Sequence, residues 1–220
     1  MKSLFISKEL SESSPILSWS KERKIKVYDK SFLTFELQPS VFPEEEVFFF
    51  TSKRAVTYFL QQHTIPKEIK IACVGQATAE ELEKLGLSVD FIGKTSGNPK
   101  KVAQELKHHY INQSIAFIGA LEGSDSIYNE FDSQRVNKYV VYKTIVIPFK
   151  IEEVFDYYVF TSPSNLEGYL ALNSLPQNAK VIAWGKTTEK ALNKYSINPC
   201  FTLENATEKE LVGKLIQDFS

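Results

Sequence analysis

The chain has 220 residues, of which 43% are hydrophobic and 24% charged, and a net charge of −1. This length suits one large domain or two of about 110 residues, and the balanced charge excludes a basic field that would attract nucleic acid. The N-terminal apolar stretch is too short for a secretory signal and no segment is long enough to cross a membrane, so we expect a cytoplasmic protein. Cys73 and Cys200 have no metal-ligand spacing and are expected to be buried, free thiols.

Apolar runs of strand length alternate with segments of helical periodicity along the chain. The expected strands cover residues 3–7, 25–28, 47–51, 69–74, 89–92, 114–119, 157–161, 181–184 and 199–203. The expected helices cover residues 13–20, 53–60, 76–84, 98–110, 164–172, 186–195 and 207–219. Ser52 precedes one helix as an N-cap, and Gly86 ends the next. This alternation predicts right-handed βαβ crossovers and parallel sheets, and therefore an α/β fold.

The chain repeats itself at a spacing of 110 residues. When residues 48–106 are laid over residues 158–216 without a gap, twelve of the 59 pairs are identical. Ordinary composition would give roughly three or four. A period this long is not that of a solenoid, so we expect two similar domains with a cleft.

The second copy ends before an equivalent of the strand at 114–119, and the N-terminal strands can supply it. We therefore expect residues 1–36 and 151–220 to form one discontinuous α/β domain, with residues 40–146 inserted as the other. The linkers near residues 32–39 and 139–150 carry β-branched and alternating residues, and they run in opposite directions. Such segments favour a two-stranded β-ladder that acts as a hinge.

Four similar turns follow strands in the two copies. They are Thr51-Ser52-Lys53-Arg54, Gly75-Gln76-Ala77-Thr78, Thr161-Ser162-Pro163-Ser164 and Gly185-Lys186-Thr187-Thr188. Each opens a helix, so free backbone N–H groups and hydroxyl donors are expected at the carboxyl edge of the sheets, where α/β proteins bind ligands. Capping alone explains any one of these Ser or Thr residues. Their recurrence in both copies favours a site for carboxylates or phosphates.

Other common functional signals are absent from the sequence. There is no Walker-type phosphate loop and no Gly-x-Ser-x-Gly motif. The histidines His63, His108 and His109 have no Cys or Asp partner at ligand spacing, so a solvated surface position is expected for each. The sequence thus indicates no conventional nucleophile, metal site or cofactor site.

Five segments carry a resemblance to a known family. They are residues 49–56 (FFTSKRAV), 74–79 (VGQATA), 97–99 (GNP), 161–164 (TSPS) and 182–188 (IAWGKTT). In this order they resemble the uroporphyrinogen-III synthases, the ring-closing and ring-inverting enzymes of haem biosynthesis. The resemblance implies two α/β domains joined by a two-stranded β-ladder, with one domain inserted in the other.

The resemblance also implies the reaction. Hydroxymethylbilane, a linear tetrapyrrole with eight carboxylates, would be cyclised to uroporphyrinogen III with inversion of ring D and loss of water. No metal or organic cofactor is implied, no nucleic acid or membrane partner is expected, and the default oligomeric state is a monomer.

The turns and the resemblance together give the expected site residues. The expected substrate contacts are Thr51, Ser52, Arg54, Gly75, Gln76, Thr78, Asn98, Gly119, Ser162, Ser164, Gly185, Lys186, Thr187 and Thr188. Thr188 and Tyr169 are the expected catalytic residues. The tyrosine that the family uses to aid leaving-group departure falls at Gly168, next to Tyr169. After Gly119, where family members often carry basic residues, the chain has Ala-Leu-Glu-Gly.

Two other functions fit parts of the pattern. A non-catalytic two-domain module that binds a small anion or acts as a sensor could use the same helix N-termini, and it would respond to a ligand without turnover. A nucleotide-dependent α/β enzyme would need the glycine-rich loop that the sequence lacks.

Overall fold

The structure is a computed structural model that describes residues 2–95, 98–123 and 125–219. The chain divides into two compact units. Unit 1 comprises Met1–Thr34 with Ile145–Ser220, and unit 2 comprises Phe35–Thr144. Among the helices that the structure describes, none is both long and apolar enough to cross a membrane.

Unit 1 contains a five-stranded sheet in the order β11-β10-β9-β1-β2, and every neighbouring pair is parallel. Its strands are β1 (Ser3–Ile6), β2 (Lys26–Asp29), β9 (Tyr157–Phe160), β10 (Lys180–Ala183) and β11 (Phe201–Thr202). Its helices are α1 (Pro15–Arg23), α5 (Pro163–Leu170), α6 (Lys186–Lys194) and α7 (Glu208–Phe219). The N-terminal strands therefore complete the sheet that the second copy begins.

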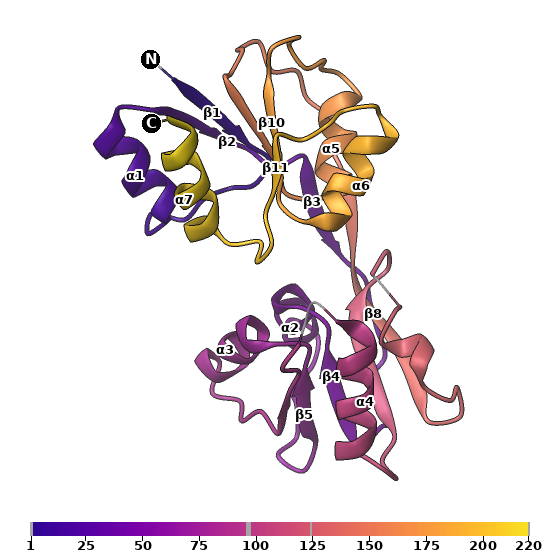
Figure 1. Cartoon of the computed structure of the whole chain (residues 1–220). Coiled ribbons are helices and arrows are strands. Elements are labelled where there is room, and N and C mark those ends of the chain that lie inside the picture. The colour runs from indigo at the N-terminus through magenta and orange to yellow at the C-terminus, as the bar shows by residue number, and fades with distance from the viewer. Residues whose placement is uncertain (1, 96–97, 124, 220) are drawn as a thin grey trace. The chain divides into compact units, whose positions relative to one another are not determined.

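Helices cover both faces of this sheet, α1 and α7 on one and α5 and α6 on the other (Figure 1). Successive side chains of a strand point to opposite faces, and β1 shows the consequence. Leu4 and Ile6 pack in the core cluster of α1 and α7, whereas Phe5 packs in the cluster of α5 and α6. Burial on both faces explains why these strands are continuous apolar runs.

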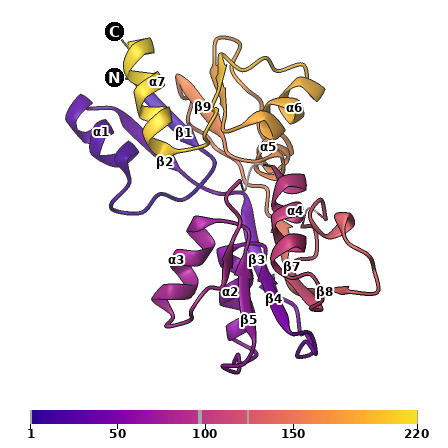
Figure 2. The same ribbon diagram turned by 60° about the horizontal axis from the view of Figure 1, so that its bottom comes forward.

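Unit 2 contains a six-stranded sheet in the order β3-β8-β7-β4-β5-β6. Its strands are β3 (Leu33–Leu37), β4 (Val47–Phe50), β5 (Lys70–Cys73), β6 (Phe91–Ile92), β7 (Ile115–Ala120) and β8 (Val136–Val146). Its helices are α2 (Lys53–Leu60), α3 (Gln76–Lys84), α4 (Pro99–His109) and the short 3-10 helix η1 (Tyr128–Glu130). Figure 2 shows α2 and α3 on one side of β4 and β5, and α4 on the other. Phe48 and Phe50 pack toward α2 and α3, and Phe49 toward α4.

The strands β3 and β8 form a ladder through which the chain passes between the units. At one end Gln38 donates its N–H to the Val141 carbonyl at 2.9 Å, and at the other Ile147 donates to the Phe32 carbonyl at 2.7 Å. Residue numbers rise along one strand as they fall along the other, so the pair is antiparallel. The other described pairs in this sheet are parallel. The predicted α/β class with parallel sheets is confirmed.

The repeat extends to the sheet order. In unit 1, β1 and β2 follow β9 across the sheet, as β7 and β8 follow β4 in unit 2. Each unit thus has the same five-strand arrangement, reached by a different path along the chain. One expectation is wrong. Cys73 is buried, but Cys200 is exposed, because Cys200 follows a short loop rather than lying within a strand.

Candidate functional site

The carboxyl ends of the parallel strands in each unit carry the predicted turns. In unit 2 the first turn is fixed by Thr51, whose N–H and hydroxyl both donate to the Ile118 carbonyl at 3.1 Å. Ser52 is the N-cap of α2 and accepts from the Ala55 N–H at 3.0 Å. Its hydroxyl also lies 3.2 Å from the Tyr142 hydroxyl. The predicted capping role of Ser52 is therefore present, and β8 adds a second hydroxyl beside it.

The charged residue of this turn is held by an aromatic ring. Arg54 is exposed, and its guanidinium carbon lies 3.4 Å from the centre of the Phe35 ring. A planar guanidinium stacks on such a face and keeps its N–H donors at the ring edge. Arg54 is therefore oriented while its donors remain available to an anion.

The equivalent turn in unit 1 uses similar bonds. Thr161 donates its N–H to the Ser7 hydroxyl and its own hydroxyl to the Ser7 carbonyl, both at 2.8 Å. Ser162 is the N-cap of α5 and accepts from the Asn165 N–H at 3.2 Å. Ser164 lies half-buried in the first turn of α5. The two copies therefore share the threonine-hydroxyl bond and the serine cap, whereas the threonine N–H donates to a side chain in unit 1 and to a backbone carbonyl in unit 2.

Asn165 is a buried polar residue beside the predicted turn that the sequence did not single out. Its side chain is buried, donates to the Ser162 hydroxyl at 3.1 Å and accepts from the Phe32 N–H at 2.8 Å. It thus joins the first turn of unit 1 to the start of β3. The signal was present in the repeat, because the equivalent residue in unit 2 is the apolar Ala55 and a polar residue on a core-facing position needs a partner.

Glycine caps the second helix of each unit. Gly75 and Gly185 have extended backbones, and neither supplies a side-chain hydrogen bond to its helix. The Thr78 N–H bonds to the Gly75 carbonyl at 3.0 Å, and neither glycine offers a side-chain acceptor to the remaining first-turn N–H groups of α3 and α6. Of the residues after these caps, Gln76, Lys186 and Thr187 are exposed, whereas Thr78 and Thr188 are buried. The exposed threonine of this turn in unit 1 is thus Thr187.

Two further predicted contacts lie at the same edge of unit 2. Asn98 is exposed and caps α4 by accepting from the Lys101 N–H at 3.2 Å. Its neighbour Gly97 lies outside the described residues. Gly119 is buried at the end of β7, where the register with β8 shifts. A Cβ at Gly119 would lie 2.6 Å from the Thr51 hydroxyl oxygen, so this close approach requires glycine.

Tyr169 lies in the core of unit 1 rather than at the carboxyl edge. The residue is 3% exposed and packs among Phe5, Phe32 and Phe160. Its hydroxyl donates to the Ser174 carbonyl at 3.2 Å. Burial, with a smaller contribution from Tyr158, raises the pKa of Tyr169 above its usual range. These contacts favour a structural role for Tyr169.

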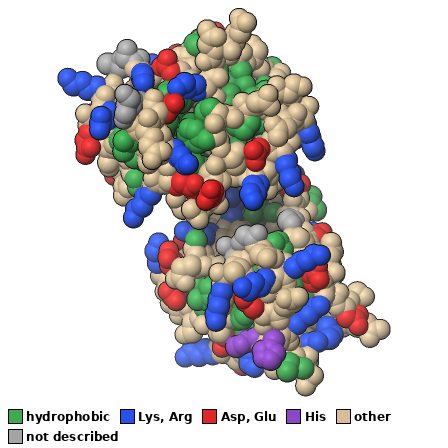
Figure 3. Space-filling model, in the orientation of Figure 1, with side chains coloured by type: hydrophobic (Ala, Val, Ile, Leu, Met, Phe, Trp, Pro, Cys, Tyr) green, Lys and Arg blue, Asp and Glu red, His purple; other side chains and the backbone are tan. Residues whose placement is uncertain are grey.

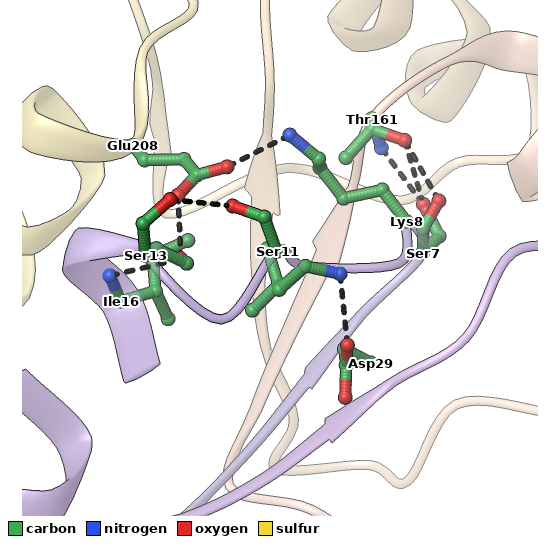
Figure 4. A network of polar contacts seen from close by, with 10 residues as sticks. Ser7, Lys8, Ser11, Ser13, Ile16, Asp29, Thr161 and Glu208 are labelled. Carbon is green, nitrogen blue, oxygen red and sulfur yellow. Dashed lines mark hydrogen bonds and ion pairs between the residues drawn. The ribbon is translucent and has the colours of Figure 1, made fainter. Parts of the chain in front are cut away.

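A charged group at the carboxyl edge of unit 1 was also missed. Lys8 follows β1 and pairs with Glu208 at 2.8 Å (Figure 4). Ser14 donates to the same carboxylate at 2.5 Å. Burial opposes ionisation of Glu208, but the bonds from Lys8 and Ser14 outweigh it and lower its pKa. The Ser7 carbonyl accepts from the Thr161 hydroxyl as the Ile118 carbonyl accepts from the Thr51 hydroxyl, so Ser7 and Ile118 are equivalent. The next residue along each strand, Lys8 in unit 1 and Gly119 in unit 2, therefore occupies an equivalent position.

Unit 2 contains a cavity of about 280 Å³ at this edge. Three predicted site residues line it, namely Thr51, Ser52 and Gly119. Within residues 2–95, 98–123 and 125–219, no three His, Cys, Asp or Glu side chains are grouped so that they could hold a metal ion. Acidic and basic side chains are interspersed on the visible face of each unit (Figure 3). Attraction of an anion therefore depends on local groups rather than on the field of the whole chain.

The comparisons with known proteins agree with this geometry. The family model described as uroporphyrinogen-III synthase HemD matches residues 24–213. No curated protein matches the chain. The solved structure of uroporphyrinogen-III synthetase from Helicobacter pylori is 17% identical, with a TM-score of 0.74 and full coverage of both chains. A mutant uroporphyrinogen III synthase from Thermus thermophilus is 15% identical, with a TM-score of 0.61, and covers 100% of this chain and 97% of its own. Both share the fold.

Proposed function

The chain belongs to the uroporphyrinogen-III synthase family, and we propose that the turns at the carboxyl edges of its two sheets bind the carboxylates of its substrate. The activity is the cyclisation of hydroxymethylbilane to uroporphyrinogen III, with inversion of ring D and loss of water. The non-catalytic sensor module is not favoured, because the family model covers most of the chain.

The observation that carries the proposal is the recurrence of the same helix N-termini in both units. Each unit has a serine-capped helix followed by a glycine-capped helix, in equivalent positions. A helix N-terminus presents unpaired N–H groups and about half a positive charge, which stabilises an anion. A substrate with eight carboxylates needs many such contacts, and a chain with a net charge of −1 must supply them locally. The expectation that the two sets of turns face each other across a cleft stays a prediction.

The reaction explains why such a site suffices. The terminal hydroxyl of the substrate leaves as water after protonation, and the adjacent pyrrole nitrogen stabilises the resulting azafulvene. Attack by the substituted carbon of ring D gives a spiro intermediate, which reopens and closes with that ring inverted. Without an enzyme, direct closure gives isomer I. The protein must therefore hold the chain in the productive geometry and prevent direct closure.

Individual residues can be given roles within this proposal. Arg54, Lys186 and Thr187 are exposed donors beside helix N-termini and would bind carboxylates directly. Gly75 and Gly185 would allow a carboxylate to approach the backbone amides of α3 and α6. Thr188 and Thr78 are buried in those first turns. They would hold the backbone amides of α6 and α3 in place rather than contact the substrate. Tyr169 is omitted, because its hydroxyl is bonded to Ser174.

We also propose that the enzyme acts as a monomer in the cytoplasm. The support for a monomer is the repeat itself, since one chain supplies both sets of turns, and the support for the location is the family of biosynthetic enzymes to which the chain belongs.

The isomer ratio tests the function. Purified protein is given hydroxymethylbilane, and the products are oxidised and separated by chromatography. We expect mostly isomer III, formed faster than isomer I forms beside heat-denatured protein. Isomer I alone, at the rate of the denatured control, would contradict the proposal.

A further inference from the structure

The cavity in unit 2 has a charged pair that the proposed function does not use. Lys138 on β8 and Asp125, in the loop after β7, are its only charged lining residues within the described chain. Their charged groups lie 2.6 Å apart. We propose that this cavity is a subsite for one carboxylate-bearing ring of the tetrapyrrole, with Lys138 as the cation that binds the carboxylate after leaving Asp125. The inference rests on the proposed function.

The size of the cavity limits what enters it. Its volume of about 280 Å³ lies just below the range of about 300–1,000 Å³ found for small-molecule pockets. It therefore suits one pyrrole with its side chains rather than four linked rings. Phe117, Ile127 and Pro99 supply apolar walls. A flat ring packs on such walls while its polar arm reaches toward hydroxyl and ammonium donors.

The polar end of the cavity is supplied by donors. Thr51, Ser52 and Tyr142 line it, and the Tyr142 hydroxyl lies 3.2 Å from that of Ser52. Gly119 keeps the wall open, since a larger residue would meet Thr51. The Thr51 hydroxyl donates to the Ile118 carbonyl, so the donors that can turn to a carboxylate are the Ser52–Tyr142 hydroxyl pair and the Lys138 ammonium. Asp125 is the competitor, because one ammonium cannot bind both carboxylates equally closely.

The partner of Lys138 is partly exposed to solvent. The Asp125 side chain is 42% exposed and that of Lys138 is 26% exposed. A partly exposed ion pair contributes little to stability, so its exchange for a substrate carboxylate costs little. Asp125 regains water when it leaves, while Lys138 keeps a negative partner throughout.

The cation is specific to unit 2. In unit 1 the strand register pairs Asp29 with Ile6, and in unit 2 it pairs Lys138 with Phe117. Ile6 and Phe117 face equivalent residues of β9 and β4, so Asp29 occupies the position of Lys138. Asp29 accepts from the Leu10 N–H at 2.8 Å and holds a loop instead. Because this position is lysine in unit 2 and aspartate in unit 1, we assign to Lys138 a role in binding that unit 1 does not share.

Two variants and a matched control test the subsite. Lys138→Gln removes the cation, and Asp125→Asn removes its competitor. Lys143→Gln is the control, because Lys143 also lies on β8 and pairs with Glu36 at 2.7 Å, yet it does not line the cavity. The measurements are KM and kcat for hydroxymethylbilane, with thermal unfolding to confirm that each variant is folded.

We expect the two cavity variants to change KM in opposite directions. Losing a charged hydrogen bond should raise KM about 10-fold in Lys138→Gln, with a smaller change in kcat. Asp125→Asn should lower KM, and Lys143→Gln should leave it unchanged. If both cavity variants change KM in the same direction, or neither changes it while wild-type protein makes isomer III, the subsite is wrong and the function stands. If wild-type protein makes only isomer I, both are wrong.

Discussion

Gly168 shows how one missing side chain sets the packing of a helix. It lies inside α5, where a Cβ would come within 2.5 Å of the Phe32 Cβ and 2.9 Å of a Val146 methyl group. The glycine thus lets α5 approach the start of β3 and the end of β8 closely. No tyrosine fits there, and the adjacent Tyr169 turns into the core.

Gly168→Ala should therefore destabilise unit 1. Overpacking of this kind costs about 1–3 kcal/mol, more than alanine gains in helix propensity. Gly213 is the control, because it is an exposed glycine inside α7 with nothing within 4 Å of a Cβ. Gly213→Ala should stabilise by about 0.5–1 kcal/mol. Urea unfolding followed by tryptophan fluorescence measures both, and equal effects at the two positions would contradict the packing argument.

The site residues divide by the kind of signal that specifies them. Ser52 and Ser162 were predictable as caps, because capping depends on neighbours a few residues away. Lys8 and Lys138 were not, because strand order brings them to the edge. A search at a fixed spacing of 110 residues could not match them, since β1 and β2 at the N-terminus are the counterparts of β7 and β8.

At the scale of elements, the helix ends of the two copies differ at one position. Gly86 follows α3 with φ at 77°, and Ser196 follows α6 with φ at 59°. The same hydrogen bonds close both helices, with Leu87 donating to the Leu82 carbonyl and Ile197 to that of Leu192. This left-handed conformation suits glycine and strains a side chain. Gly86 was predicted as a helix stop, and the strained Ser196 was not.

Exchanging the residues at these helix ends should give effects of opposite sign. Gly86→Ala should destabilise unit 2 by about 1–2 kcal/mol, because alanine strains the left-handed backbone. Ser196→Gly should stabilise unit 1 by about 0.5–1 kcal/mol, since relief of strain exceeds the added flexibility of the unfolded chain. A Cβ at Gly86 meets nothing within 4 Å, so a loss of stability would report backbone conformation alone. Chemical denaturation of each variant measures the shift, and a loss at both positions would refute the argument.

Longer elements were predicted better than their boundaries. The apolar runs and caps predicted the strands and helices of both sheets, because burial on two faces leaves continuous apolar strands. The start of β8 at Val136 was not predicted, because the strand first pairs with β7 and then with β3. The first half of β8 is polar, and it forms a strand only because it pairs with β7. The helix η1 was missed for a similar reason, since one turn has no periodicity to detect.

At the scale of the whole molecule, each core cluster draws its residues from one unit. Two clusters of the described residues lie in unit 1 and two in unit 2. The repeat predicts two similar domains, and that domain organisation stays a prediction. We propose that the units are separate folding domains, because each has its own sheet and its own buried aromatic residues.

Two natural probes can follow the units independently. Both tryptophans, Trp19 and Trp184, lie in unit 1, so intrinsic fluorescence reports its unfolding. Cys73 lies in the core of unit 2, and burial raises the pKa of its thiol to about 11, so it reacts with a thiol reagent only after that unit opens. Cys200 is exposed and would react in the folded state, so Cys200→Ser provides the background for labelling.

In urea we expect the fluorescence transition and the Cys73 labelling transition to have different midpoints. Gly168→Ala should lower the fluorescence midpoint and leave the labelling midpoint unchanged, because its clash lies wholly in unit 1. Gly86→Ala should lower only the labelling midpoint, because Gly86 lies in unit 2. A change in midpoint without a change in slope identifies a loss of stability rather than a change in the unfolded chain. If each variant moved both transitions equally, the chain would unfold as one cooperative unit and the two-domain proposal would fail.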